Sequence, residues 1–150
     1  MTLDLGDNLA EQAVQWIGVK YEHRGTTRYG CDCTGLIIGC LRELGYMGRY
    51  KLRNYPFDWN LHAGAGDYLC QELDKIATDV TGQQPEPGDI AVFRFGKCRA
   101  HAGIVCNWPI FVHSLVTREQ CCRASAHGPL WKRRLDRLYR LDIRKLGRYD

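Results

Sequence analysis

The sequence predicts an α+β fold, with N-terminal helices packed on an antiparallel β-sheet. Two observations carry this prediction. Apolar residues recur at helical spacing in the first half of the chain, whereas short segments of alternating apolar and polar residues fill most of the second half. A glycine- and proline-rich segment at residues 82–88 separates the two halves. The 150 residues suffice for one hydrophobic core, so we expect a single domain over residues 1–150.

Glycines are expected to end the two helices nearest the N-terminus. Asn8 begins a capping-box pattern, which predicts a first helix at about residues 8–17 that ends at Gly18. The second helix is expected to begin at Cys33 and to stop before Gly45. Its apolar stripe consists of Leu36, Ile37, Cys40, Leu41 and Leu44.

A third helix is expected after an irregular, aromatic stretch at residues 46–65. Asp67 is its predicted N-cap, because an acidic side chain there can accept hydrogen bonds from the first turn. The buried face of this helix would comprise Leu69, Leu73, Ile76 and Val80.

The second half of the chain predicts four short strands. They are expected at residues 90–95, 102–105, 110–116 and 120–124. The segment that follows is ambiguous, because alternation at residues 139–144 favours a strand whereas Trp131, Leu135 and Leu138 share one helical face.

The net charge of +4 is unevenly distributed along the chain. Residues 123–150 carry nine basic and three acidic residues, whereas residues 1–122 carry twelve and fourteen. A basic end is typical either of a chain with an anionic partner, such as nucleic acid or a cell-wall polymer, or of a solvated face of the last element. We favour the solvated face and expect no nucleic-acid partner. The sequence contains no run of about 18 apolar residues, which excludes a membrane span.

Eight cysteines are many for a chain of this composition. The N-terminus lacks a basic segment followed by an apolar stretch, so we expect synthesis in the reducing cytoplasm, without a secretory signal, and mostly reduced thiols. Four cysteines are expected to be small buried apolar side chains: Cys40, Cys70, Cys98 and Cys106. The question is whether any of the others has a chemical function.

Cys33 differs from the other cysteines because it follows a polar loop and begins a predicted helix. Unpaired backbone N–H groups and the positive end of the helix dipole favour a thiolate at such a position. Cys31, two residues earlier, is either a bystander or a thiol that could trap Cys33 on oxidation. A structural zinc site formed by Cys31, Cys33, Cys121 and Cys122 remains an alternative, although the spacing differs from the common zinc knuckle.

His101 and His113 are the candidates for the base and its partner. If residues 106–108 form a three-residue hairpin loop, Val105 lies opposite Pro109 and the two histidines lie opposite each other, on the same face. A loop of two residues would put them on opposite faces. The remaining histidines, His23, His62 and His127, are left without a role.

Several motifs then resemble one family in the right order. Residues 32–36 (DCTGL) resemble the Asp-Cys-Ser-Gly-Leu signature of NlpC-type papain-like cell-wall peptidases. Residues 87–93 are similar to the opening of a strand in that family, residues 101–105 to its base-bearing strand, and residues 111–113 to the site of its third polar residue. Residues 16–21 are similar to the family's Trp-x-Gly-x-x-Tyr entry. The resemblance covers most of the chain and implies a papain-like fold.

Three further segments resemble the branch of this family found in tailed phages and gene transfer agents. They are residues 30–33, 55–59 and 128–131. This resemblance implies an enzyme of the virion tail that acts on the host cell wall, with phage tail proteins as partners.

The resemblance implies a role for each matching residue. Cys33 would be the nucleophile, His101 the general base and later acid, and His113 the residue that orients it, with no metal or organic cofactor. Tyr21 would position substrate or support the oxyanion, and Asp32 and Thr34 would bind the free amine of the substrate. The structural alternatives are a helix cap for Asp32, an ordinary first-turn residue for Thr34 and core packing for Tyr21.

The implied reaction is hydrolysis of the γ-D-glutamyl-diaminopimelate bond in peptidoglycan (murein) stem peptides. Two alternatives stay open: a different Cys-His amidase of the cell wall, and a non-catalytic structural module of a phage tail.

Overall fold

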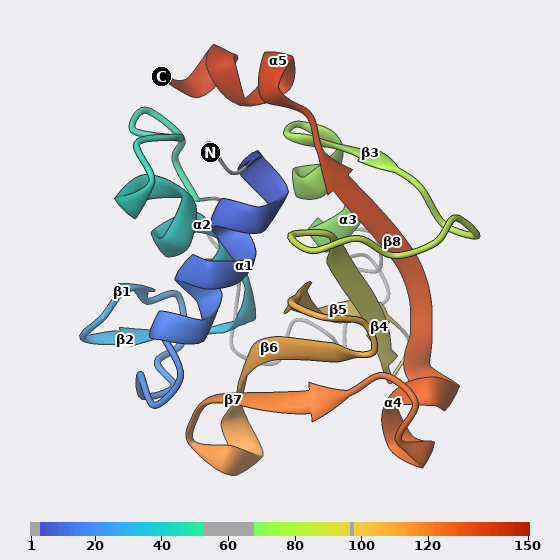
Figure 1. Cartoon of the computed structure of the whole chain (residues 1–150). Helices are drawn as coiled ribbons and strands as arrows, with labels where there is room; N and C mark the ends of the chain where they lie inside the picture. The colour runs from blue at the N-terminus through green and yellow to red at the C-terminus, as the bar shows by residue number, and fades with distance from the viewer. Residues whose placement is uncertain (1–3, 53–67, 97) are drawn as a thin grey trace.

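The computed structural model describes residues 4–52, 68–96 and 98–150, and within them the fold is α+β as predicted (Figure 1). A six-stranded sheet has the order β3-β8-β4-β5-β6-β7 with antiparallel neighbours, and β1 and β2 form a small separate ribbon. The helices are α1 (Leu5–Gln15), α2 (Cys33–Glu43), α3 (Tyr68–Asp74), α4 (Pro129–Arg134) and α5 (Ile143–Leu146). The strands are β1 (Thr26–Thr27), β2 (Gly30–Cys31), β3 (Ala77–Asp79), β4 (Ile90–Phe95), β5 (Cys98–Val105), β6 (Ile110–Leu115), β7 (Gln120–Ser125) and β8 (Leu135–Leu141).

Helix α1 begins earlier than the sequence pattern predicts. Asp4, not Asn8, is the N-cap, and its carboxylate accepts a hydrogen bond from the backbone N–H of Asp7 at 2.8 Å. The extra turn docks on the segment before β4, where a Cβ at Gly6 would lie 2.3 Å from the carbonyl oxygen of Pro87. Tertiary packing therefore favours the earlier of two acceptable caps.

Helix α2 confirms its predicted bounds, whereas α3 is shorter than expected. Helix α3 ends at Asp74, because the residues that follow pair as β3 with β8, with Ala77 opposite Leu141. Ile76 and Val80 are still buried, so their apolar character is used outside the helix. The predicted cap, Asp67, lies outside the described residues, as does most of the aromatic stretch.

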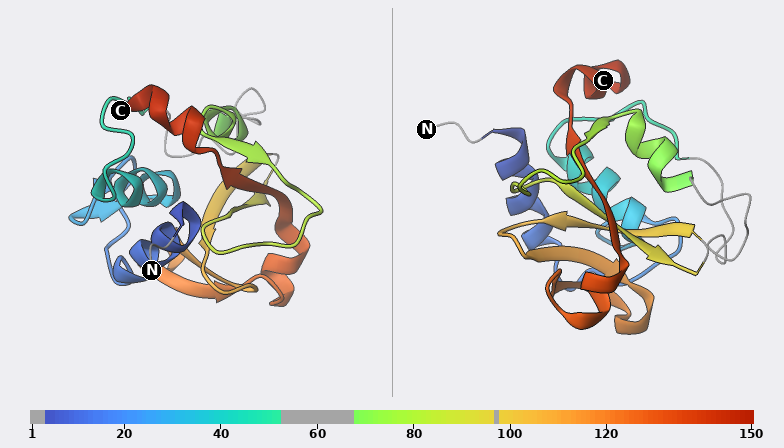
Figure 2. Two further views of the ribbon diagram at one scale, coloured as in Figure 1. Left: turned by 45° about the horizontal axis from the view of Figure 1, so that its top comes forward. Right: turned by 90° about the vertical axis from the view of Figure 1, so that its right-hand side faces the viewer.

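The four predicted strands are present, with small changes at their ends. Strand β4 has the predicted bounds, β6 and β7 differ by one residue at one end, and β5 begins four residues early at Cys98. The ambiguous segment contains both structures. Trp131 lies on α4, whereas Leu135 and Leu138, expected on the same helical face, lie on β8. Of the alternating residues, 139–141 lie on β8 and 143–144 on α5. Figure 2 shows β8 running from α4 at one end of the molecule to α5 at the other.

The two faces of the sheet contribute to two different hydrophobic clusters. Ala102, Ile104 and Val112 face the cluster that α1 and α2 complete. The cluster on the other face includes Phe93, Phe111 and Trp131. In the described part of the chain, no helix has both the length and the apolar character that a membrane crossing requires.

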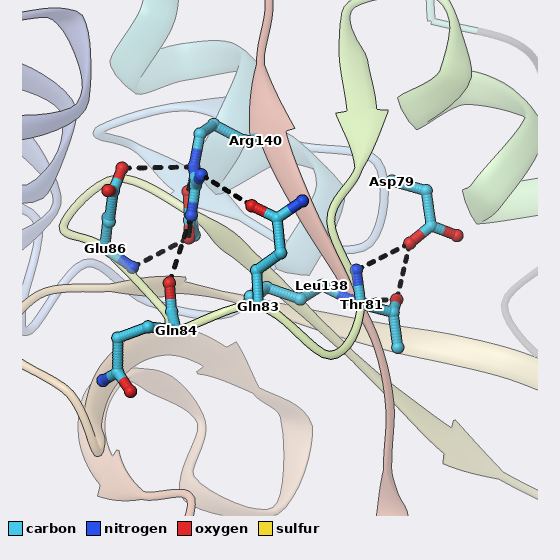
Figure 3. A network of polar contacts seen from close by, with 8 residues as sticks. Asp79, Thr81, Gln83, Gln84, Glu86, Leu138 and Arg140 are labelled. Carbon is cyan, nitrogen blue, oxygen red and sulfur yellow. Dashed lines mark hydrogen bonds and ion pairs between the residues drawn. The ribbon is translucent and has the colours of Figure 1, made fainter.

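An ion pair between a half-buried arginine and a buried aspartate joins β8 to the turn that precedes β4 (Figure 3). Arg140 donates to both carboxylate oxygens of Asp89, at 3.0 and 2.9 Å, and also bonds the backbone carbonyl of Gln84. Asp89 is only 1% exposed and accepts a further bond from the backbone N–H of Glu86. Asp89 therefore has a structural role.

We expect Arg140→Met to lower the free energy of unfolding by about 3 kcal/mol, because it leaves the buried Asp89 carboxylate without its cation. Arg137→Met on the same strand is the matched control. Its partner Asp79 is 3.8 Å away and both side chains are partly exposed, so we expect a loss of less than about 0.5 kcal/mol. Urea denaturation measures both, and equal losses would contradict a special role for Arg140.

Candidate active site

The loop before α2 is tied to the sheet at Cys31. The backbone N–H of Cys31 donates to Lys20, and its carbonyl oxygen accepts from Glu22 and from the hydroxyl of Ser114, at 2.6 Å. Tyr21 in turn donates its backbone N–H to Glu119, beside β7. The residues that precede Cys33 are therefore held against the edge of the sheet and against β6.

Asp32 is the N-cap of α2. One carboxylate oxygen accepts from the backbone N–H of Gly35 and the other from that of Arg24, each at 2.8 Å. The loop lies directly on the first turn of the helix, since a Cβ at Gly35 would come within 1.6 Å of the carbonyl oxygen of Gly25. The cap interpretation of Asp32 is thus confirmed, and the residue is 4% exposed.

Cys33 is the first residue of α2, as predicted, but the pKa of its thiol is not lowered. The side chain is buried and is hydrogen-bonded to the backbone of Ala102, with the Thr34 hydroxyl 3.9 Å from its sulfur. Burial, followed by the nearby Asp32 carboxylate, raises the pKa of Cys33 to about 12 despite these bonds. The expectation from the helix start alone was therefore wrong, because the loss of water outweighs the favourable end of the dipole. The resting group is a thiol.

His101 and His113 form a hydrogen-bonded pair, with His101 Nε2 2.7 Å from His113 Nδ1. The predicted hairpin register was wrong by two residues, since Val105 lies opposite Phe111 rather than Pro109. The turn at residues 106–109 is longer than the predicted loop. A shift of two residues preserves which side chains share a face, and so the two histidines still meet.

Both histidines are neutral at rest. Burial, followed by the neighbouring His113, holds the pKa of His101 well below its usual range, and burial lowers the pKa of His113 to about 4. One proton lies between the two nitrogens. If His101 Nε2–H donates to His113 Nδ1, then Nδ1 of His101 has a free lone pair and can accept a proton from elsewhere.

The nucleophile candidate lies against the strand of the base candidate. The sulfur of Cys33 is hydrogen-bonded to the backbone of Ala102, the residue after His101. Tyr21 is also close, because Asp32 and Cys33, after burial, help to raise the pKa of its phenol. Thr34 is buried on the first turn of α2. The fold thus places Tyr21, Asp32, Cys33 and Thr34 together at the start of α2, and the hydrogen-bonded histidine pair on the strands beside it.

The sequence patterns did not predict the partner of Cys31. Its sulfur lies 3.4 Å from that of Cys121 on β7, and both side chains are fully buried. The two free thiols are hydrogen-bonded, so Cys31 helps to hold the loop against β7. Because the Cys31 thiol is paired with Cys121, the hypothesis that it traps Cys33 on oxidation is not supported. Among the described residues, no group of three or more His, Cys, Asp or Glu side chains is arranged to hold a metal ion.

Comparison with known proteins identifies relatives over most of the chain. The model of the NlpC/P60 family matches residues 18–140. The chain is 27% identical over 139 residues to a protein of Escherichia coli strain K12 named murein DD-endopeptidase MepS/murein LD-carboxypeptidase. The alignment covers 93% of this chain and 64% of that protein, so the chain spans less than two thirds of the relative's length.

Solved structures of NlpC/P60 domains share the fold. The NlpC/p60 domain of the peptidoglycan hydrolase SagA has a TM-score of 0.62 at 16% identity, over 92% of this chain and 100% of that domain. RipD of Mycobacterium tuberculosis, a non-catalytic NlpC/p60 domain protein adapted to peptidoglycan binding, has a TM-score of 0.56 at 11% identity, over 95% and 99% of the two chains. The papain-like α+β fold is thereby confirmed.

The lowered histidine pKa values predict that acid destabilises the protein. The unfolded chain protonates His113 near its ordinary pKa of about 6.5, whereas the folded chain does so only near 4. The stability that a neutral His113 contributes is therefore complete above about pH 6.5 and is lost as the pH falls toward 4. We expect this residue alone to lower the free energy of unfolding by about 3 kcal/mol across that window.

Urea denaturation at pH 7 and pH 4.5 measures this loss. Between the two pH values, His113→Gln should lose less stability than the unsubstituted protein. His127→Gln removes an exposed histidine and should lose as much stability as the unsubstituted protein. An identical loss in all three proteins would contradict the assignment to His113.

Proposed function

Because the chain belongs to the NlpC/P60 family, we propose that it is a cysteine peptidase that hydrolyses murein stem peptides. The observation that carries the proposal is the assembly at the start of α2. The Cys33 thiol is hydrogen-bonded to the backbone of Ala102, the residue after His101, and the His101 ring is hydrogen-bonded to that of His113. A nucleophile, a base and an orienting group in this order can perform acyl transfer.

The reaction would begin from neutral groups. The sulfur of Cys33 attacks the carbonyl carbon of the scissile amide while Nδ1 of His101 takes the thiol proton. The negative charge that develops on the carbonyl oxygen is stabilised by the backbone N–H of Cys33 and by the phenol of Tyr21, which its raised pKa keeps protonated. His101 then gives its proton to the departing amine, and a thioester remains on Cys33.

Water completes the cycle. His101 takes a proton from water, the oxygen attacks the thioester carbon, and the thiol of Cys33 leaves with that proton. His113 keeps His101 in the required tautomer because its Nδ1 accepts a hydrogen bond from Nε2–H of His101. These steps require only the chain's own residues and water.

The stem-peptide assignment is supported by the relatives and by two residues of the site. Asp32 and Thr34, on the first turn of α2, are proposed to bind the free amine of the substrate. The carboxylate of Asp32 is fixed there by backbone hydrogen bonds from Gly35 and Arg24, with His23 Nδ1 4.0 Å away, and its negative charge would attract an ammonium group.

We propose the γ-D-glutamyl-diaminopimelate bond as the bond that is cleaved. The family resemblance of residues 32–36 supports this choice. The E. coli relative carries the name of a DD-endopeptidase and LD-carboxypeptidase, which makes bonds with a D-amino acid the second candidate. The masses of the products distinguish the two.

The setting that we propose is the tail of a phage-like particle, in which the enzyme would open the host cell wall. Only the resemblance of residues 30–33, 55–59 and 128–131 to that branch supports it. Detection of the chain and of murein hydrolysis in purified particles is the test, and their absence would rule the setting out.

The main experiment is mass spectrometry of purified muropeptides after incubation with the protein. We expect fragments split after γ-D-glutamate, and we expect Cys33→Ala to lower the rate by at least about 10⁴-fold because it removes the nucleophile. Cys106→Ala is the matched control, since the Cys106 thiol contacts the backbone carbonyls of Ala10 and Ile104, away from the start of α2, and its loss should leave the rate unchanged. No product from folded protein would favour a binding module of the RipD kind, and a different product would favour another amidase.

A second prediction concerns the orienting residue. We expect His113→Ala to lower kcat by about 10²–10⁴-fold, since the neutral tautomer of His101 is then no longer held. In His113→Gln the side-chain oxygen can still accept from Nε2, so we expect a loss of only about tenfold. Steady-state kinetics with a purified stem peptide measures both. Equal losses would contradict the acceptor role.

A further inference from the structure

Trp131 reaches the two histidines from outside their strands. It lies on α4, the short helix that connects β7 to β8, where Gly128 is the N-cap and Pro129 the first helical residue. Its indole is stacked on the ring of His101, with the centroids 5.5 Å apart and the planes at 29°. The same indole meets His113 edge-on, at 4.9 Å and 85°.

The other rings around the pair come from the sheet itself. Phe93 and Phe95 of β4 contact His101, and Phe111 of β6 contacts His113. His101 is 7% exposed and His113 1% exposed. Trp131 contacts all three phenylalanines as well as both histidines, so this one side chain from α4 completes the enclosure.

We propose that Trp131 is a positioning residue of the active site: its indole covers the hydrogen bond between His101 and His113, keeps water from it and holds the His101 ring in the orientation that catalysis needs. This inference rests on the proposed function for its catalytic consequence. It assigns a role to Trp131, which the mechanism above does not use.

Two physical effects follow from the stacked indole. A hydrogen bond between neutral groups is stronger where water cannot compete for either partner, so the cover keeps Nε2 of His101 on His113. His101 becomes a cation only when it takes the thiol proton, and a cation stacked on an indole face is stabilised. The second effect acts on the charged form alone, so it would favour the reaction over the resting state.

The groups that face the pair come from several elements. The closest titratable group to His101 is His113 on β6. On α4 the Arg134 guanidinium lies 4.4 Å from the centroid of the Phe95 ring, and Phe95 contacts His101. Cys33 of α2 meets the same strand at Ala102 and is a neutral thiol at rest. A change in histidine titration caused by a variant at Trp131 has to be judged against these neighbours, which the variant leaves in place.

The test combines histidine titration by NMR with steady-state kinetics. In Trp131→Leu, water gains access to the pair, so we expect the pKa values of His101 and His113 to rise by about one unit toward the ordinary value. We expect kcat to fall by about 10–100-fold, with KM changed by less than about twofold, because the ring is misplaced while the substrate site remains. Trp131→Phe keeps an aromatic face and should restore most of both properties.

Trp108→Leu is the matched control. It removes another indole packed against the cluster that contains Trp131, one that contacts the exposed His127 instead of the pair. We expect no change in the pKa of His101 or His113 and none in kcat. Thermal melting confirms that each variant is folded. If Trp131→Leu does not fold, Trp131→Phe is compared with the unsubstituted protein. The smaller ring leaves part of the pair uncovered, so we expect the histidine pKa values to rise by about 0.3 unit, and no rise would overturn the covering role.

The outcomes separate this inference from the proposed function. Unchanged histidine pKa values and unchanged kcat in a folded Trp131→Leu variant would overturn the role of Trp131. Equal effects of Trp131→Leu and Trp108→Leu would also overturn it, since they would indicate general loosening of the cluster. Shifted histidine pKa values in a protein that releases no product would support the covering role and refute the peptidase.

Discussion

The hydrogen bond from the Ser114 hydroxyl to the carbonyl oxygen of Cys31 joins the two halves of the candidate site. Ser114 follows His113 on β6, and Cys31 precedes the nucleophile candidate by two residues. The site needs this joint because its groups belong to different layers, the thiol to a helix and the imidazoles to the sheet. Backbone pairing of Cys31 with residues 20–22, and of that segment with the beginning of β7, prevents the loop from moving independently of the sheet.

Burial determines the protonation of the site more than any single charge does. The same loss of water raises the pKa of the thiol and lowers those of the imidazoles, so all three groups rest uncharged. In such a site the cysteine and the histidines form no ion pair before the substrate binds. Charge separates only when the proton moves from sulfur to nitrogen, and the fixed dipoles and rings around the histidines then act on it without reorganisation.

Local sequence signals predicted those parts of the fold that local forces determine. Helix α2 and strand β4 have the predicted bounds because capping, apolar periodicity and breakers agree there. The start of α1 and the end of α3 were mispredicted because docking on Pro87 and pairing with β8 decided them. The six candidate site residues were predicted from their motifs, whereas the contacts of Cys121 and Trp131 were not, since each meets its partner only in the folded chain. Cys31 and Cys121 are 90 residues apart, a separation over which no periodicity gives a signal.

Gly103 leaves the space in which the Phe111 ring packs against His113. A Cβ at this position would lie 2.4 Å from Cδ2 of Phe111, whose ring in turn meets His113 edge-on at 4.8 Å. Gly103 does not have a positive φ, so its backbone conformation does not require glycine. A glycine is needed here because a larger side chain would collide with the Phe111 ring. Any side chain at residue 103 would push on the imidazole through the Phe111 ring. The size of the side chain at residue 103, two residues from His101, therefore determines by steric contact alone where the His113 ring can lie.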